Sequence, residues 1–522
     1  MKRRVLASLL ILILLLSAYT WTKIHKSSTT DMSYTIDYQD EALSGSYQGD
    51  LAFFTPNGQG VFTAENGVSI DAVWDNGVPT AVREMTLPNG RQLAGRWQDD
   101  ILNVIDYRIN KMDAIEDLKQ LDQAITDYYV GDVESVHYHI AASIAELNKA
   151  VFETENHAAS EARISERSAE TGQSETTIEA LTFYQMICEL VHGGGDSHFK
   201  SYYQFYNKAL PFTVAYIDGI AYIDQPNDEL ALAIGDKLMT INDTPIKTYF
   251  ESGIFPSSRG RAAFIERYAL SDVFLNLYFG VYDSFKLVFQ KQDGQLVEQT
   301  VSCTNAGLDA YIRKYHGDAP VSLIEGDGYH VLKIKSMTTD HLSMILQDCF
   351  NVIQKDEVLL IDISECSGGD SGFIRQLMMY FPVDTYQTQS YAAMQQENLW
   401  IENYHQEPIY YGKVFVCISE NTSSSAAALA AVMKASNTSQ IVGSDIGELF
   451  ASTGDSITIK LDHSFIEVDI PRHMFTSPIP NDQSSWLKAD KEMNIRLLKL
   501  QEGETAAYNA IVKQVNTSDE KS

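Results

Sequence analysis

Basic residues are scarce in this sequence. Its 522 residues include 39 Lys or Arg against 70 Asp or Glu, which gives a formal net charge of −31 at pH 7. Proteins that bind nucleic acid present a basic patch or stripe to the phosphate backbone. The composition therefore argues against a nucleic-acid partner, while an apolar content of 44% is that of a globular protein.

Cysteine is also scarce. The five cysteines are scattered along the chain, at positions 188, 303, 349, 366 and 417. An odd number without metal-ligand spacing predicts neither a disulfide framework nor a zinc site. Most of them lie in apolar segments and are predicted to be buried thiols. We expect no metal and no cofactor.

The sequence also lacks one hydrolase motif and one export motif. No G-x-S-x-G motif is present, so the run His192-Gly-Gly-Gly does not indicate a lipase, although such a run can supply an oxyanion hole in that class. His192 is instead predicted to end a helix. No lipobox cysteine follows the apolar N-terminal run, which argues against a lipoprotein.

That N-terminal run predicts export. Residues 1–21 have a basic start followed by an apolar stretch from Val5 to Leu16, the pattern of a signal peptide. A clean A-x-A cleavage site is missing, so removal of the segment and its retention as a membrane anchor both stay open. As a helix, residues 5–21 would span about 26 Å against a bilayer core of ~30 Å. Either outcome places the remainder outside the cytoplasm, secreted or membrane-anchored.

The pattern along the chain predicts a multidomain α/β protein. The length alone suggests about three or four domains. The predicted parts are a signal peptide or anchor (1–21), a linker (22–34), β-hairpin repeats (35–104), a helical subdomain (105–200), a β insert (205–305), an α/β core (318–500) and a polar tail (501–522).

The β-hairpin region contains an internal repeat. Trp74 recurs as Trp97 and Gly67 recurs as Gly90, both after 23 residues. Asn-Gly turns punctuate the strands, which predicts a meander of hairpins. The layout resembles membrane occupation and recognition nexus (MORN) repeats. The resemblance implies a module that docks to a membrane or cell envelope, and a purely structural spacer is the alternative.

Helical spacing dominates the next region, and short strands follow it. Apolar residues at helical spacing predict helices at 112–129, 136–152 and 178–191. Composition predicts the other elements. These are a polar loop at 153–176, strands at 220–223, 273–281 and 285–289, and a helical turn at 228–232. The run Ile234-Gly-Asp-Lys-Leu-Met-Thr-Ile-Asn242 resembles the "G-D-x-I-x-x-I-N" strand of a PDZ domain. This resemblance implies capture of an extended peptide by strand addition; a β insert without a ligand is the alternative.

Two strand–turn–helix units in the α/β core carry complementary chemistry. A buried strand at 357–363 leads to Gly368-Gly369, where backbone N–H groups can approach a ligand without Cβ interference. A second strand at 413–419 leads through a polar turn to Ser425, at the start of a helix whose free N–H groups can face an oxyanion. A plain N-cap serine is the alternative interpretation.

Four motifs, taken in order, resemble one family. They are Gly195-Asp-Ser-His198, the PDZ-like strand, Ile361-Asp-Ile-Ser-Glu-Cys-Ser-Gly-Gly369, and Thr422-Ser-Ser-Ser-Ala-Ala followed by Ile441-Val-Gly-Ser-Asp-Ile-Gly447. The order resembles the tail-specific, or C-terminal-processing, serine peptidases in their tricorn-like branch, over roughly residues 110–500. The resemblance implies a crotonase-like or ClpP-like core of ββα units.

The resemblance also implies roles for individual residues. Ser425 matches the nucleophile and His198 the general base. The oxyanion hole would be formed by Gly368, Gly369 and the N–H of Ala426. The acid of the triad falls near Asp482 in a loose alignment, with Asp196 as the fallback. A serine needs such a base, and the base needs an acid that holds its tautomer.

The Ser–Lys branch of the family is excluded by a missing lysine. That branch places a lysine about 25 residues after the serine, but position 450 is Phe450 and no lysine lies between Lys434 and Lys460. Departures from the motifs at Ser364, Cys366, Ser444 and Phe199 weaken the case for activity. The resemblance thus implies an exported serine endopeptidase that cleaves peptides or protein tails through an acyl-enzyme. An inactive, peptidase-like surface binding protein is the alternative.

Overall fold

The structure is a computed structural model of the whole chain. It describes residues 27–519 with gaps at 39–40, 89–91, 99–100, 105–107, 162–176, 194–195, 197, 203–207, 257–260, 281, 283, 305–306, 308–313, 315–318, 354–357, 392–398, 447–450, 465 and 480–486. The chain divides into two compact units, residues 1–114 with 148–183 and residues 115–147 with 184–522. The predicted signal peptide or anchor lies outside the described residues.

The first unit contains a seven-stranded antiparallel meander in which each strand pairs with the next along the chain. Its strands are β1 (Ser27–Tyr38), β2 (Glu41–Ala52), β3 (Thr55–Ala64), β4 (Ser69–Asp75), β5 (Val78–Thr86), β6 (Gln92–Gln98) and β7 (Ile101–Val104). The predicted hairpins are therefore present. The linker prediction is wrong for residues 27–34, because they pair with β2 as part of β1.

Aromatic packing explains the glycine pattern of this meander. The buried Trp74 ring lies 5.0 Å from that of Tyr47 and donates its N–H to the Gly60 carbonyl at 3.0 Å. A Cβ on Gly60 would come within 2.1 Å of the Tyr47 hydroxyl oxygen, so only glycine fits beneath this ring. The repeated Trp97 is also buried, with its ring 5.2 Å from that of Tyr38.

Helices follow where the apolar spacing predicts them. They are α2 (Lys111–Tyr128), α3 (Val133–Glu161) and α4 (Ala180–His192), with the short strands β8 (Arg108–Asn110) and β9 (Thr177–Glu179) paired to each other. The predicted loop is wrong for residues 153–161, which continue α3. The polar composition of the whole stretch 153–176 suggested a loop. The Glu and Ala residues within 153–161, however, are good helix formers.

The β insert is a small sheet with short helices beside it. Its strands are β11 (Thr213–Ile217), β12 (Ile220–Gln225), β13 (Lys237–Ile241), β14 (Thr244–Pro245), β15 (Phe285–Gln290) and β16 (Leu296–Val301), with the 3-10 turn η1 (Asp228–Leu230) and helices α5 (Ile246–Phe250), α6 (Arg261–Tyr268) and α7 (Asp272–Phe279). The strand predicted at 273–281 is wrong, because Ser271 caps α7 by accepting from the N–H of Phe274. A short apolar run does not distinguish a buried helix from a strand.

The α/β core is built on a six-stranded sheet in the order β17 (Val321–Gly326), β18 (Tyr329–Ile334), β19 (Val358–Asp362), β23 (Val414–Ile418), β24 (Gln440–Gly443) and β27 (Lys491–Glu492). Only β17 and β18 pair antiparallel, and the remaining neighbours are parallel. All five residues of β19 and of β23 are buried. Parallel strands covered on both faces read as continuous apolar runs, which is why the sequence revealed them.

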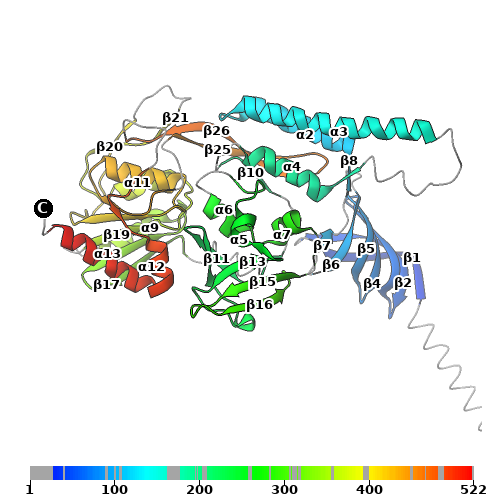
Figure 1. The fold of residues 1–522 in the computed structure, drawn as a ribbon, viewed down its shortest axis with the longest axis horizontal. Helices are drawn as coiled ribbons and strands as arrows, with labels where there is room; N and C mark the ends of the chain where they lie inside the picture. The colour runs from blue at the N-terminus through cyan, green and yellow to red at the C-terminus, as the bar shows by residue number, and fades with distance from the viewer. Residues whose placement is uncertain are drawn as a thin grey trace, which may run out of the picture. The chain divides into compact units, whose positions relative to one another are not determined.

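Helices cover both faces of this sheet. Helices α9 (Leu342–Val352), α10 (Gly372–Met378) and α11 (Ser425–Ala435) share one core cluster with alternate strand residues such as Leu359 and Ile361. Helices α12 (Ile495–Glu502) and α13 (Glu504–Asp519) share the other cluster with Leu360. Figure 1 shows these elements in its yellow-to-red part. The predicted polar tail is wrong for most of 501–522, since α13 buries Tyr508, Ile511 and Val515.

A second sheet brings distant segments to this core. It consists of β10 (Lys200–Tyr202), β21 (Ser390–Tyr391), β25 (Ala451–Lys460) and β26 (Glu467–Thr476), with β26 in the middle. Two further strands, β20 (Thr385–Gln387) and β22 (Trp400–Glu402), form a separate pair. The pairing of β10 with β26 places the His198 segment beside residues more than 250 positions later.

Burial agrees with the cysteine prediction: Cys188, Cys349, Cys366 and Cys417 are buried, and all five thiols are free. Burial raises the pKa of Cys188 to about 12 and that of Cys366 to about 11. Such thiols are poor nucleophiles near neutral pH.

In the described part of the chain, none of the helices combines the length and apolar character needed to cross a bilayer.

His192 ends α4, as predicted, and makes the stability of this region depend on pH. Burial lowers the pKa of His192 to about 4, although its Nδ1–H donates to the carbonyl of Ile254 at 2.9 Å. Between pH 6.5 and 4 the unfolded chain binds a proton here that the folded chain does not. The free energy of unfolding should therefore fall by up to about 3 kcal/mol as the pH drops through this range.

Chemical denaturation at pH 7, 5.5 and 4.5 measures this effect. The variant His192→Gln should show a flatter pH dependence than the wild type. The exposed His139 provides a control, and His139→Gln should keep the wild-type slope. Equal slopes for all three proteins would contradict the assignment.

Candidate active site

Two turns meet at the carboxyl ends of the neighbouring parallel strands β19 and β23. The first, residues 363–370, follows β19 and contains Gly368 and Gly369; we call it the Gly-Gly turn. The second, residues 419–424, follows β23 and leads into α11; we call it the serine turn. The strands pair directly, with Ile361 opposite Val416, so the two turns emerge side by side. This edge of a parallel sheet is where α/β proteins bind ligands.

Hydrogen bonds join the two turns along their length. The Thr422 hydroxyl donates to the Ile363 carbonyl at 2.9 Å, and the Ser423 N–H donates to the Cys366 carbonyl at 3.3 Å. Gly368 has φ of 97° and lies against the serine turn, where a Cβ would come within 2.8 Å of the Ser424 Cβ. The sequence motif Gly-Gly therefore reflects both a left-handed backbone and a close approach.

Two neighbouring serines at the helix start have different environments. Ser425 is the first residue of α11, and its hydroxyl donates to the Gly369 carbonyl at 2.7 Å. Ser424 precedes the helix with φ 54° and ψ −133°, a conformation that is costly for any residue with a Cβ. Strain of this kind is held in place by surrounding structure and clusters at active sites.

Some backbone N–H groups near these serines donate hydrogen bonds within the protein, and others do not. The Ala426 N–H donates to the Ser423 carbonyl at 3.1 Å. The N–H groups of Ser425 and Gly369 have no acceptor among the described residues. An oxyanion hole needs donors that are free for the substrate oxygen. The arrangement therefore supports Gly369 and favours Ser425 over the predicted Ala426 as the second donor.

A cavity of about 300 Å³ lies on one side of Ser424, and we call it the His198 cavity. It is lined by His198, Lys200, Tyr202, Pro256, Ala263, Phe264, Arg267, Tyr268, Ser367, Gly368, Gly369, Ser423 and Ser424. The predicted base and the predicted oxyanion turn thus share one cavity with a serine, although that serine is Ser424. Ser425 does not line it.

The His198 segment is fixed through its backbone. The Asp196 carboxylate accepts from the N–H of His198 at 2.9 Å and from the hydroxyl of Thr453 at 2.6 Å. The hydroxyl of Ser456 donates to the His198 carbonyl at 3.4 Å. Asp196, the fallback acid, therefore ties this loop to β25. Asp482, the predicted acid of the triad, lies outside the described residues.

A second cavity of about 380 Å³ also has Ser424 in its wall, and we call it the His473 cavity. It is lined by Gly369, Asp370, Ser371, Gln389, Ser424, Ser425, Ser452, Thr453, Gly454, Asp455, His473 and Phe475. His473 Nδ1 lies 2.7 Å from an Asp455 carboxylate oxygen, which can only accept, so Nδ1 carries the proton. Asp455 itself has a φ of 52° within β25.

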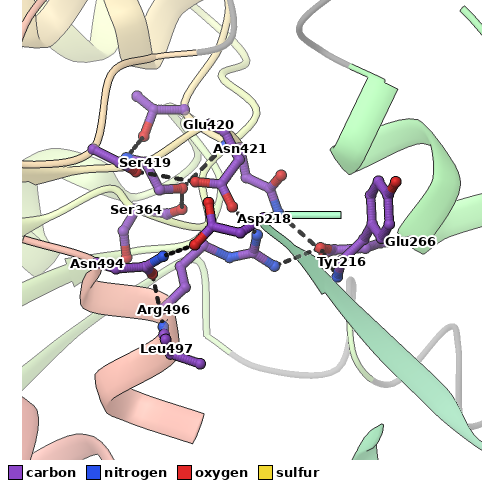
Figure 2. A network of polar contacts seen from close by, with 12 residues as sticks. Tyr216, Asp218, Glu266, Ser364, Ser419, Glu420, Asn421, Asn494, Arg496 and Leu497 are labelled. Atoms are coloured by element: carbon purple, nitrogen blue, oxygen red, sulfur yellow. Dashed lines mark hydrogen bonds and ion pairs between the residues drawn. The ribbon is translucent and has the colours of Figure 1, made fainter. Parts of the chain in front are cut away.

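A buried charge network holds the serine turn from behind (Figure 2). The Arg496 guanidinium pairs with Glu266 at 2.5 Å and with Glu420 at 2.6 Å. Glu266 also accepts from the side-chain amide of Asn421 at 3.0 Å. The side chains of Arg496 and Glu266 are 3% and 2% exposed, so solvent barely screens their attraction. The network joins α6, the serine turn and α12.

A second buried pair lies beneath the Gly-Gly turn. Burial by itself would raise the pKa of Asp362, but the Lys499 ammonium at 2.5 Å and the hydroxyls of Tyr508 and Ser364 outweigh it and lower the pKa to about 2. A depressed carboxyl pKa stabilises the fold above about pH 4, the unfolded value, and this contribution is lost as the pH falls towards 2. Asp362 is the last residue of β19, so the pair anchors the start of the turn.

Ser424, Asp455 and His473 line these two cavities, and the sequence-based predictions did not include them. Ser424 stands in a run of three serines, and nothing in that run reveals which residue adopts the strained backbone. Asp455 and His473 lie 18 positions apart on two strands of one hairpin, where Gly454 pairs with His473. Two alternating strands around a polar turn at 462–464 were a usable signal.

Residues 328–474 match the model of Peptidase family S41. This part of the chain is an S41 peptidase domain. The family predicted from the four motifs is thereby confirmed, and it supports a serine-type peptidase. The matched range contains both turns, Asp455 and His473, whereas His198 and Asp482 lie outside it. No curated protein sequence matches the chain.

Solved structures support the fold. The chain is similar to mature CPAF complexed with lactacystin, with a TM-score of 0.57 and 12% identity over 78% of this chain and 98% of that chain. It is also similar to mature CPAF alone, with a TM-score of 0.56 and 13% identity over 77% and 96%. At these identities the similarity concerns the fold alone.

The buried network predicts that replacing Arg496 lowers the free energy of unfolding more than replacing Arg472 does. In Arg496→Met, Glu266 and Glu420 lose their buried partner, and the free energy of unfolding should fall by about 3–5 kcal/mol. Arg472 pairs with Asp455 at 3.2 Å but is 45% exposed, so Arg472→Met should cost at most about 1 kcal/mol. Urea denaturation measures both values. A cost below about 1 kcal/mol for Arg496→Met would show that the network does not secure the fold.

Proposed function

We propose that the protein is an exported serine endopeptidase of the tail-specific type, which hydrolyses peptides or protein tails through an acyl-enzyme. One observation carries the proposal. A serine with a strained backbone lines two cavities together with Gly369, whose N–H has no acceptor among the described residues, and it shares one of these cavities with His198. These are the parts that acyl transfer needs, namely a nucleophile, a base and a donor for the oxyanion.

The reaction follows from these parts. The serine hydroxyl attacks the peptide carbonyl while His198 takes its proton, and the N–H groups of Gly369 and Ser425 receive the oxyanion. Each such donor contributes roughly 3 kcal/mol to the transition state. His198 then passes the proton to the leaving amine, and a water molecule hydrolyses the acyl-enzyme by the same steps in reverse.

The geometry favours Ser424 over the predicted Ser425 as the nucleophile. Ser424 lines both cavities, one of them together with His198, whereas Ser425 lines only the His473 cavity and its hydroxyl already donates to the Gly369 carbonyl. With Ser424 as nucleophile, the next N–H along the chain is that of Ser425, which is free. The first N–H after the nucleophile is a common oxyanion donor.

Labelling with a fluorophosphonate probe tests this assignment. The wild type should be labelled, Ser424→Ala should lose labelling, and Ser425→Ala should retain it with a slower rate. Ser436 at the far end of α11 provides the control, because Ser436→Ala should label like the wild type. Loss of labelling only in Ser425→Ala would restore the sequence-based prediction. If the folded wild-type protein is not labelled, the peptidase proposal is refuted.

Three features extend the proposal beyond the catalytic centre. The apolar N-terminal segment supports export. The sheet of β11–β16, with its PDZ-like strand, would capture an extended peptide at an edge strand. The β1–β7 meander would dock the enzyme to a membrane or cell envelope. Deletion of residues 27–104 should then abolish binding to envelope fractions while fluorophosphonate labelling persists.

A further inference from the structure

We propose that the turn between β2 and β3, formed by Phe53 and Phe54, inserts into the interfacial region of a lipid bilayer. We call these two residues the Phe-Phe tip. The inference rests on the proposed docking role of the β1–β7 meander and names lipid as its partner. It does not depend on the chemistry at Ser424, so either proposal can fail without the other.

Large apolar side chains are exposed at this end of the meander. Phe54 is 73% exposed, and Phe53 remains 62% exposed with the contacts that it makes. Val78, the first residue of β5, is 46% exposed. The Gly77 N–H donates to the Pro56 carbonyl at 2.9 Å, so the β4–β5 turn lies beside the start of β3. Transfer of these side chains from water into lipid is favourable.

The backbone of the Phe-Phe tip is also unfavourable for its residues. The angle φ is 53° at Phe53 and 65° at Phe54, which are the left-handed values of a two-residue hairpin turn. Asn and Gly dominate such turns, because a positive φ is costly for a bulky side chain. The β4–β5 turn of the same meander has this usual pair, Asn76 and Gly77, at φ of 49° and 91°. Folding alone therefore does not explain two phenylalanines at positions 53 and 54.

The start of β1 indicates which surface the tip meets. Ser27 pairs with Leu51, two residues before the Phe-Phe tip, so the chain enters the meander at the same end. The predicted export segment ends six residues earlier, at residue 21, and six residues span at most about 20 Å. With that segment in a bilayer, the tip is held near the bilayer surface. Two weak attachments on one chain strengthen each other, so the tip supports a segment that is short for a bilayer.

The charge of the meander selects the kind of lipid surface. Residues 27–104 contain 11 Asp or Glu against three Arg and no Lys, and Asp50 lies three residues before the tip. Anionic headgroups attract polybasic segments, which the meander does not have. Apolar insertion rather than charge attraction therefore holds the tip. This favours a zwitterionic surface, and added salt should not weaken the binding.

Sedimentation with vesicles tests the inference. The chain from residue 22 onward keeps every described residue and removes the apolar segment, which would bind lipid by itself. This chain should bind phosphatidylcholine vesicles, and the double variant Phe53→Asn with Phe54→Gly should lower the partition coefficient about tenfold or more. Vesicles that contain phosphatidylglycerol should bind less protein, and salt should not release it from phosphatidylcholine.

Control variants separate lipid contact from a structural role. Because Asn and Gly suit a left-handed turn, the double variant should unfold at the same or a higher urea concentration than the wild type, although it binds less lipid. Phe53→Trp with Phe54→Trp should keep the binding, since Trp favours the membrane interface. Tyr138 on α3 is 72% exposed, and Tyr138→Asn should bind vesicles like the wild type.

The full chain shows whether the tip reaches lipid when the N-terminal segment is present. In proteoliposomes of phosphatidylcholine with brominated acyl chains, the fluorescence added by Phe54→Trp should be quenched. The fluorescence added by Tyr138→Trp should not be quenched. Equal quenching of the two added signals would contradict insertion of the tip.

Vesicle binding can also overturn the inference. If the wild type does not bind vesicles, or the Asn-Gly double variant binds as well as the wild type, lipid insertion by the tip is wrong. Binding to envelope fractions that survives lipid extraction would then assign the meander to a protein or polymer, and the proposed docking role would stand. If the protein binds neither vesicles nor envelope fractions, the docking role is refuted as well. Fluorophosphonate labelling reports the peptidase proposal separately.

Discussion

The contact between the Gly-Gly turn and the serine turn is the constraint on which the rest of the site depends. The turns emerge from adjacent parallel strands, and backbone and hydroxyl hydrogen bonds join them from Thr422 to Ser425. Gly368 permits this approach because any side chain there would collide with Ser424. At this contact Ser424 has a strained backbone conformation, which the surrounding structure must hold in place.

Buried charges hold this arrangement from behind. Arg496 and Lys499, one turn apart on α12, reach Glu420 of the serine turn and Asp362 at the foot of the Gly-Gly turn. A buried ion pair is weak evidence for stability, but the loss of one partner leaves a buried charge without compensation, so these pairs restrict where the serine turn and Asp362 can lie. The C-terminal helices therefore take part in positioning the site, which a polar tail would not do.

Particular residues show how far the sequence predicts the fold. Strands β19 and β23 were evident because continuous apolar runs bounded by turn residues are typical of buried parallel strands. Residues 273–281 were assigned to a strand, but the cap at Ser271 starts a helix there. Tyr508, Ile511 and Val515 lie at helical spacing in a polar background, and only the sheet face above them shows that they are buried.

The sequence by itself determined the family and the two turns and named Gly369 and His198 as candidate site residues, because these depend on residue type and order. The tertiary structure decided which serine is strained, which N–H groups lack an acceptor among the described residues, and that Asp455 on β25 and His473 on β26 line a cavity together with Ser424. Those features depend on backbone angles and on pairing between segments distant in sequence. Local residue order carries too little information about either to predict them.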